Sequence, residues 1–320
     1  MRTLVIGVAA TIVVIGFAIS MWSFLSDSYD AYTGVTPAST TTYAPGTTKP
    51  PSTGTAIKVP APDANPSDLP APSTYDEATQ WMNNNSVYSK TITVPTDCAV
   101  TPVNIQTASA SALESHLNEL TACLWRVWDP PLASAGYELP RPPVTVYTQP
   151  VTTACGKLDD VNAVYCGGDQ RIYYAKPLYQ IIPTSLRGSP FIADTIIAHE
   201  FGHTIQARTG ILISETAWEQ RSSTSSSKAL EFSRRTEMQA DCFAGMFTSS
   251  VASANHLSSA DLKNLGTMIY NLGDDVLTGQ PGYVDNHGSG AARRTWFTAG
   301  QKSTKMATCD TFTASSANVR

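Results

Sequence analysis

The sequence predicts an α+β fold in which a mainly helical domain carries a small β-sheet. Leucines and a tryptophan recur along one stripe of residues 110–128, as on a helix with one buried face. Residues 144–148 and 171–175 are rich in β-forming or alternating side chains, which indicates strands. Further helices are expected at residues 74–84, 190–210, 225–250, 259–272 and 290–301. No internal repeat is evident, and we assign these elements to one domain, residues 73–320.

An uncharged aliphatic segment, residues 4–25, lies near the start of the chain. About 20 apolar residues suffice to cross the hydrocarbon core of a bilayer as a helix. Trp22 near its far end suits an interfacial anchor, and Arg2 before it orients the N-terminus toward the cytoplasm. We therefore expect residues 1–25 to form a single-pass transmembrane anchor in the cell membrane, with the rest of the chain outside. A cleaved signal peptide is the alternative, and it would make the protein secreted.

Residues 26–72 are rich in Thr, Pro, Ser and Ala and contain almost no large aliphatic side chains. Such a segment cannot bury enough apolar surface to offset the entropy lost on ordering. We expect a disordered linker that holds the following domain away from the membrane.

The run His199-Glu200-Phe201-Gly202-His203 is the most informative part of the expected helix at residues 190–210. Positions four apart share a helix face, so His199 and His203 can bind one metal ion together. Glu200 lies about 100° further round the helix, close to that ion without being compelled to bind it. From there it can act as a general base toward a water molecule whose pKa zinc has lowered to about 7. The alternative is a core helix whose two histidines only form hydrogen bonds.

A third ligand must come from elsewhere in the chain. The pattern that supplies a third histidine fails here, because Gln206 and Thr209 stand where its glycine and histidine should be. About 30 residues on, Glu237 and Asp241 are again four apart and share a helix face. We assign Glu237 as the third metal ligand and Asp241 as the acceptor of a ligating histidine's free ring N–H. A solvated acidic pair on a surface helix is the alternative.

These motifs resemble a known family. H-E-x-x-H followed by a separate E-x-x-x-D helix is similar to the gluzincins, the thermolysin-like peptidases, and residues 233–241 also resemble their integral-membrane branch. Residues 237–245, 286–289 and 296–300 resemble the bacterial family called putative neutral zinc metallopeptidases. The resemblance covers roughly residues 160–312. It implies a zincin-like metallopeptidase domain, a zinc cofactor and a peptide or protein substrate.

Two further roles follow from the resemblance alone. Thermolysin-like enzymes use a remote histidine to stabilise the tetrahedral oxyanion, and His287 is the candidate here, with Tyr283 as the alternative donor. A helix-capping or surface role is the other interpretation of His287. The strand at residues 171–175 precedes the metal helix, where gluzincins have an edge strand that pairs with extended substrate. His116 and His256 lack an acidic or metal-like context, and we expect both at the surface.

All six cysteines lie in the expected domain, and an even number in an exported chain indicates three disulfides. Six cysteines permit 15 connectivities. We expect Cys98–Cys123, Cys155–Cys166 and Cys242–Cys309, of which the last would tie the chain's end to the Glu237 helix. A cysteine-bound structural zinc is the alternative, but the sequence has no C-x-x-C pair.

A net charge of −5 without a basic cluster argues against nucleic acid as a partner. The function that the sequence predicts is that of an exported, membrane-anchored zinc peptidase. A surface binding or scaffolding module with structural zinc is an alternative, and a zinc amidase acting on non-protein amides is another. The sequence leaves the oligomeric state open.

Overall fold

The computed structural model describes residues 58–159, 161–222 and 226–320. Its helices are α2 Tyr75–Asn83, α3 Ala110–Ser134, α4 Ile192–Arg208, α5 Ile211–Arg221, α6 Ser227–Ser250, α7 Ser259–Asn271, α8 Asp274–Leu277 and α9 Gly290–Gln301. Its strands are β1 Val144–Tyr147, β2 Val151–Thr153, β3 Gly156–Leu158, β4 Ala163–Cys166 and β5 Arg171–Ala175. This mainly helical arrangement with a small sheet confirms the predicted α+β class. No helix in these three ranges is long and apolar enough to cross a membrane, and the expected anchor lies outside them.

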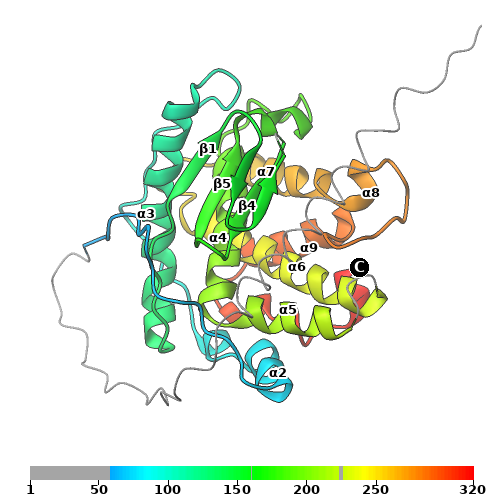
Figure 1. Ribbon diagram of the computed structural model, residues 1–320. Helices are drawn as coiled ribbons and strands as arrows, with labels where there is room; N and C mark the ends of the chain where they lie inside the picture. The colour runs from blue at the N-terminus through cyan, green and yellow to red at the C-terminus, as the bar shows by residue number, and fades with distance from the viewer. Residues whose placement is uncertain (1–57, 160, 223–225) are drawn as a thin grey trace, which may run out of the picture.

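The sheet has the strand order β1-β5-β4, with β1 parallel and β4 antiparallel to β5. It lies across α4, and α3 runs beside β1 (Figure 1). The expectation that residues 171–175 form an edge strand is therefore wrong, because β5 is paired on both sides. The edge nearest α4 is β4, a four-residue strand that the sequence did not reveal because it is too short to show alternation.

The helices stack in the order α4, α6, α9, and this stack forms the centre of the core (Figure 1). Close approach is possible because glycines stand at the contacts. A Cβ on Gly245 of α6 would collide with the carbonyl oxygen of Phe297 in α9, and one on Gly300 would collide with the carbonyl oxygen of Cys242. On the other side, Gly202 of α4 lies against Ala240 of α6.

Three helices differ from the expectation: α3 is longer, and α5 and the four-residue α8 were not expected. Helix α3 continues to Ser134 through Pro130 and Pro131, and Pro131 and Leu132 are buried in this last part of the helix. Helix α5 was not expected at all. It follows α4 directly, since Gly210, in the left-handed region at φ 74°, ends one helix and starts the next.

The three disulfides join the expected pairs: Cys98–Cys123, Cys155–Cys166 and Cys242–Cys309. His256 is exposed, as expected. The surface position expected for His116 is wrong: it is 6% exposed, and its Nε2 lies 2.9 Å from Oδ1 of Asp194. This buried pair joins α3 to the first turn of α4.

The part of the expected linker that the structure describes, residues 58–72, packs against the domain instead of standing apart. Leu69 is buried, and Arg208 of α4 donates hydrogen bonds to the backbone oxygen and the hydroxyl of Ser67. The linker expected before residue 58 lies outside the described residues.

We expect Gly245→Ala to lower the free energy of unfolding by about 2 kcal/mol or more, because the new methyl group forces α6 and α9 apart. Gly188→Ala is the matched control, since a Cβ there meets no atom within 4 Å. Urea unfolding measures both. Equal midpoints for the two variants would contradict this account of the helix contact.

Candidate metal centre

Helix α4 holds the H-E-x-x-H run in the middle of the molecule. Every residue of α4 except His203 is buried. The apolar side chains before the motif suit this buried position. His203 is partly exposed, with 13% of its side chain accessible, and it faces a cavity of about 160 Å³. The same cavity is lined by His199, Glu200 and Glu237.

Possible ligand atoms of three residues converge beside this cavity. The Nε2 atoms of His199 and His203 lie 3.2 Å apart, and they lie 3.3 Å and 3.5 Å from the two carboxylate oxygens of Glu237. Tetrahedral zinc with bonds of about 2.1 Å places neighbouring ligand atoms about 3.4 Å apart. The spacing therefore matches a zinc site, and no other such group of His, Cys, Asp or Glu is present among the described residues.

Hydrogen bonds at the Nδ1 atoms of His199 and His203 explain why their Nε2 atoms are free to bind a cation. Nδ1 of His199 lies 2.9 Å from Oδ1 of Asp241, and Nδ1 of His203 lies 2.8 Å from Oε1 of Gln206. The Gln206 amide donates to the carbonyl oxygen of Thr236, so its oxygen is the atom that faces His203. Both Nδ1 atoms therefore donate, which leaves two Nε2 lone pairs and a carboxylate facing one another. These groups repel each other unless a cation lies between them, so the residues present suit zinc.

In the metal-free protein a proton can lie between the two Nε2 atoms and the Glu237 carboxylate in place of a metal ion. Burial lowers the pKa of His199, but Asp241 and Glu237 outweigh burial and raise it to about 10. Burial raises the pKa of Glu237, but the two histidines outweigh burial and hold the pKa of its carboxyl well below the usual range. Metal binding must displace the proton of His199 and is therefore coupled to pH.

Arg293 of α9 belongs to this site, although no sequence motif pointed to it. Its Nε and Nη2 atoms donate to the two oxygens of Asp241 at 2.8 Å and 3.0 Å, and its Nη2 lies 3.8 Å from Glu237. Asp241 is fully buried, and burial alone would raise its pKa. Arg293 and His199 outweigh that effect and hold the pKa below its usual range, so Asp241 remains a carboxylate.

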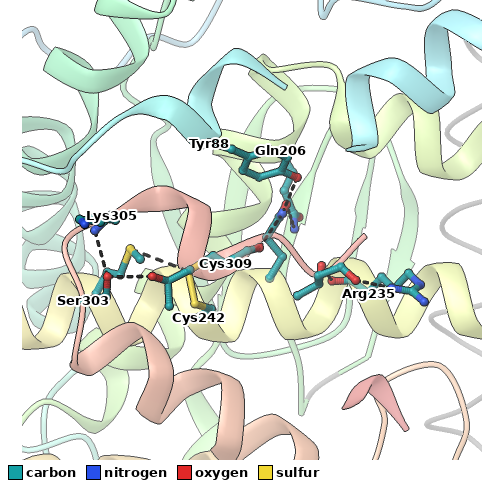
Figure 2. Close-up of a disulfide and its surroundings, with 11 residues drawn as sticks. Tyr88, Gln206, Arg235, Cys242, Ser303, Lys305 and Cys309 are labelled. Atoms are coloured by element: carbon teal, nitrogen blue, oxygen red, sulfur yellow. Dashed lines mark hydrogen bonds between the residues drawn. A yellow bond between two sulfur atoms is a disulfide. The ribbon is translucent and has the colours of Figure 1, made fainter. Parts of the chain in front are cut away.

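A second chain of contacts runs from His203 through Gln206 to a disulfide. Figure 2 shows Gln206 and Tyr88 above the Cys242–Cys309 disulfide at which it ends. The Gln206 amide also donates to Oε1 of Gln239, and the Gln239 amide donates to the Tyr88 hydroxyl and to the carbonyl oxygen of Cys309. Cys309 is bonded to Cys242, the residue next to Asp241. The disulfide thus fixes the end of the chain against the helix that carries Glu237.

Glu200 and His287 lie in the same cavity without joining the ligand group. Glu200 is 6% exposed and accepts a hydrogen bond from the backbone N–H of Tyr165 at 2.8 Å. Nδ1 of His287 lies 3.4 Å from Oδ1 of Asp274, whose other oxygen accepts from backbone N–H groups of Asp285 and Gly288. Asp274 therefore holds the loop that presents His287.

The alternative donor, Tyr283, is 39% exposed, and its hydroxyl donates to Asp285. It is not among the described residues that line the cavity. Of the two candidates, the structure brings only His287 to the site.

The H-E-x-x-H run and the ligand group that it forms with Glu237 indicate a zinc site of the H-E-x-x-H class. The family profile described as "Putative neutral zinc metallopeptidase" matches residues 89–312, and the chain belongs to this family.

Among its relatives, "Uncharacterized protein Rv2575" of Mycobacterium tuberculosis is 31% identical over 206 residues, which cover 59% of this chain and 67% of the relative. "Uncharacterized protein YpfJ" of Escherichia coli is 30% identical over 192 residues, covering 58% and 66%. No solved structure gave a significant match.

We expect Glu237→Ala to lose stoichiometric zinc, because it removes one of the three ligand atoms. We expect Gln206→Leu to weaken zinc binding about 10- to 100-fold, because it removes the bond that orients His203. Thr204→Val is the matched control on the same helix: this residue is 2% exposed and its hydroxyl has no partner among the described residues. Competition with a chelator measures all three affinities. An unchanged affinity in Glu237→Ala would assign the third ligand to another residue.

Proposed function

We propose that the protein is an exported, membrane-anchored zinc peptidase that hydrolyses peptide bonds. The observation that carries the proposal is Glu200, a buried carboxylate beside three ligand atoms that it does not join. A structural metal site has no use for such a group, whereas a hydrolytic site needs a general base there. Family membership supports the peptidase class.

Export and anchoring are supported by different observations. Three disulfides are typical of proteins that fold in an oxidising compartment. The uncharged segment at residues 4–25 supports a membrane anchor, with secretion after signal-peptide cleavage as the alternative.

His199, His203 and Glu237 would hold the zinc ion. When bound, zinc lowers the pKa of a water molecule and polarises the scissile carbonyl. Glu200 takes the proton from water and delivers it to the leaving amine. The backbone N–H of Tyr165 fixes one oxygen of Glu200 at 2.8 Å, which leaves the other oxygen to exchange the proton.

His287 stabilises the oxyanion by donating a hydrogen bond from its ring. Burial lowers its pKa, but Asp274 and Glu237 outweigh burial and raise it, which favours a ring that carries a proton on both nitrogens. A fixed donor of this kind acts where negative charge develops and loses no energy to reorganisation. Asp274 positions the ring through its contact with Nδ1.

Strand β4 is the surface on which an extended substrate can lie. It pairs with β5 alone among the described strands, and Val164 and Tyr165 line the cavity. A peptide that pairs with this edge passes directly over Glu200, because Tyr165 belongs to the edge strand and its backbone N–H donates to that carboxylate.

We expect Glu200→Gln to keep stoichiometric zinc and to lower turnover about 10²- to 10⁴-fold, because the amide cannot accept the proton. Incubation of zinc-loaded wild type and variant with a diverse peptide mixture, followed by mass spectrometry of the products, measures the difference. Undiminished cleavage by the variant would refute the assigned general base.

We expect His287→Gln to lower kcat about 10²- to 10³-fold with little change in KM, as for loss of an oxyanion donor. Tyr283→Phe is the control, and it should leave both constants unchanged. A large loss in Tyr283→Phe with normal turnover in His287→Gln would reverse the two assignments.

A further inference from the structure

Residues 58–72, which we call the strap, precede α2 and pack on the outside of the domain. Figure 1 shows the strap in blue, running from α3 to α2. Its first part is fixed beside the start of the sheet. The backbone N–H of Asp63 donates to the carbonyl oxygen of Arg141, just before β1, at 2.8 Å. Nη1 of Arg141 in turn donates to the carbonyl oxygen of Pro60 at 2.8 Å.

The second part of the strap reaches the turn that joins β4 to β5, residues 167–170. The side-chain amide of Gln170 donates to the carbonyl oxygen of Ser67 at 2.8 Å. Leu69 is 5% exposed, and a Cβ on Gly167 would lie 3.6 Å from its Cδ1 atom, which is ordinary van der Waals contact. The strap therefore touches both ends of this turn.

Arg208, in the last turn of α4, joins the strap and this turn to the metal helix. Its Nη1 donates to the carbonyl oxygen of Ser67 at 2.8 Å and to Oε1 of Gln170 at 3.0 Å, and its Nη2 donates to the Ser67 hydroxyl at 2.8 Å. Arg208 is 5% exposed, and no carboxylate among the described residues forms an ion pair with it. A buried guanidinium with neutral acceptors is stable only where those acceptors are held around its planar fork. The strap and the turn are therefore fixed against the end of α4.

This contact is placed to act on the edge strand. The turn follows directly from β4, in which the backbone N–H of Tyr165 donates to Glu200. The Cys155–Cys166 disulfide also fixes this end of β4, but it ties the strand to the β2–β3 hairpin and not to α4. Because Arg208 belongs to the helix that carries the two histidine ligands, its contacts set the end of β4 against the metal centre.

We propose that the strap positions edge strand β4 for an incoming peptide, and that it acts through Ser67, Gln170 and Arg208. The inference rests on the proposed function, in which an extended peptide pairs with this edge. Strand pairing needs donors and acceptors at fixed positions, because main-chain hydrogen bonds weaken steeply when they are misaligned. A turn that is released from Ser67 lets the end of β4 shift. Peptides of every sequence then lose affinity to a similar extent, because their backbones are alike.

Peptide retention tests this without requiring turnover. The protein is the full chain carrying zinc and Glu200→Gln, so that peptides remain intact. The probe is a mixture of N-acetylated, C-amidated hexapeptides of random sequence, and mass spectrometry quantifies what is bound. Gln170 has a φ of 53°, a left-handed conformation that Asn adopts readily, so Gln170→Asn keeps the turn while its shorter side chain loses the bond to Ser67. We expect the retained peptides to bind about 5- to 10-fold more weakly, whatever their side chains.

Kinetics give a second measurement. With Glu200 intact, Gln170→Asn should raise KM for the most strongly cleaved peptide about 5- to 10-fold and leave kcat within about twofold. Arg208→Lys keeps the charge but loses the planar fork, and it should act in the same direction. Zinc content and thermal unfolding midpoint are measured for each variant, so that loss of folding is not read as loss of peptide binding.

Asn85→Ala is the matched control. The Asn85 amide donates to the carbonyl oxygen of Thr209 at 3.0 Å, at the same end of α4, and none of its described hydrogen bonds reaches the β4–β5 turn. We expect this variant to lower the thermal unfolding midpoint while leaving peptide retention unchanged.

The proposal is overturned if the parent retains no peptide, or if the parent and Gln170→Asn retain peptides equally. A loss confined to peptides with particular side chains also overturns it, because the turn would then recognise side chains. An equal loss in Asn85→Ala contradicts it as well, since the strap would then act through overall stability alone. If the parent retains peptides but the wild type cleaves none, the proposed function fails while this inference stands.

Discussion

The interaction on which the rest of the structure depends is the buried contact of Asp241 with His199 and Arg293. It joins three helices, α4, α6 and α9, through one fully buried carboxylate. Removing Arg293 would leave the buried Asp241 carboxylate without its cation, which is among the most destabilising changes a core can undergo. The same contact fixes the register of α6 against α4, and this register brings Glu237 under both imidazoles. Core packing and ligand geometry are therefore set by one group.

The remaining contacts hold this arrangement from the side away from the substrate. The Cys242–Cys309 disulfide and the chain Gln206–Gln239 fix the end of the chain and the ring of His203. On the open side stand β4, α5 and the loop that carries His287. A site supported from behind by packed helices keeps its ligands in place while its open side receives a peptide.

The sequence predicted the parts of the site that are local. Ligands four residues apart on a helix produce a pattern that is visible without a fold, and both E-x-x-x-D and H-E-x-x-H are of this kind. Arg293 and Gln206 were missed because their roles depend on contacts between separate helices that no spacing reveals. Strand β4 was missed because four residues show no periodicity, and the edge position was assigned to β5 because strand order is a property of the whole sheet.

Four acidic residues at this site show that the partner, more than the residue type, determines the role. Asp241 is held as a carboxylate by Arg293 and positions an imidazole. Glu237 lies between two histidines and can bind a metal ion. Glu200 accepts a hydrogen bond from a backbone N–H of β4, a neutral donor, and is the general base of the proposed mechanism. Glu215 is buried beside Glu219, and burial together with this neighbour raises its pKa well above the usual range, which favours the protonated form.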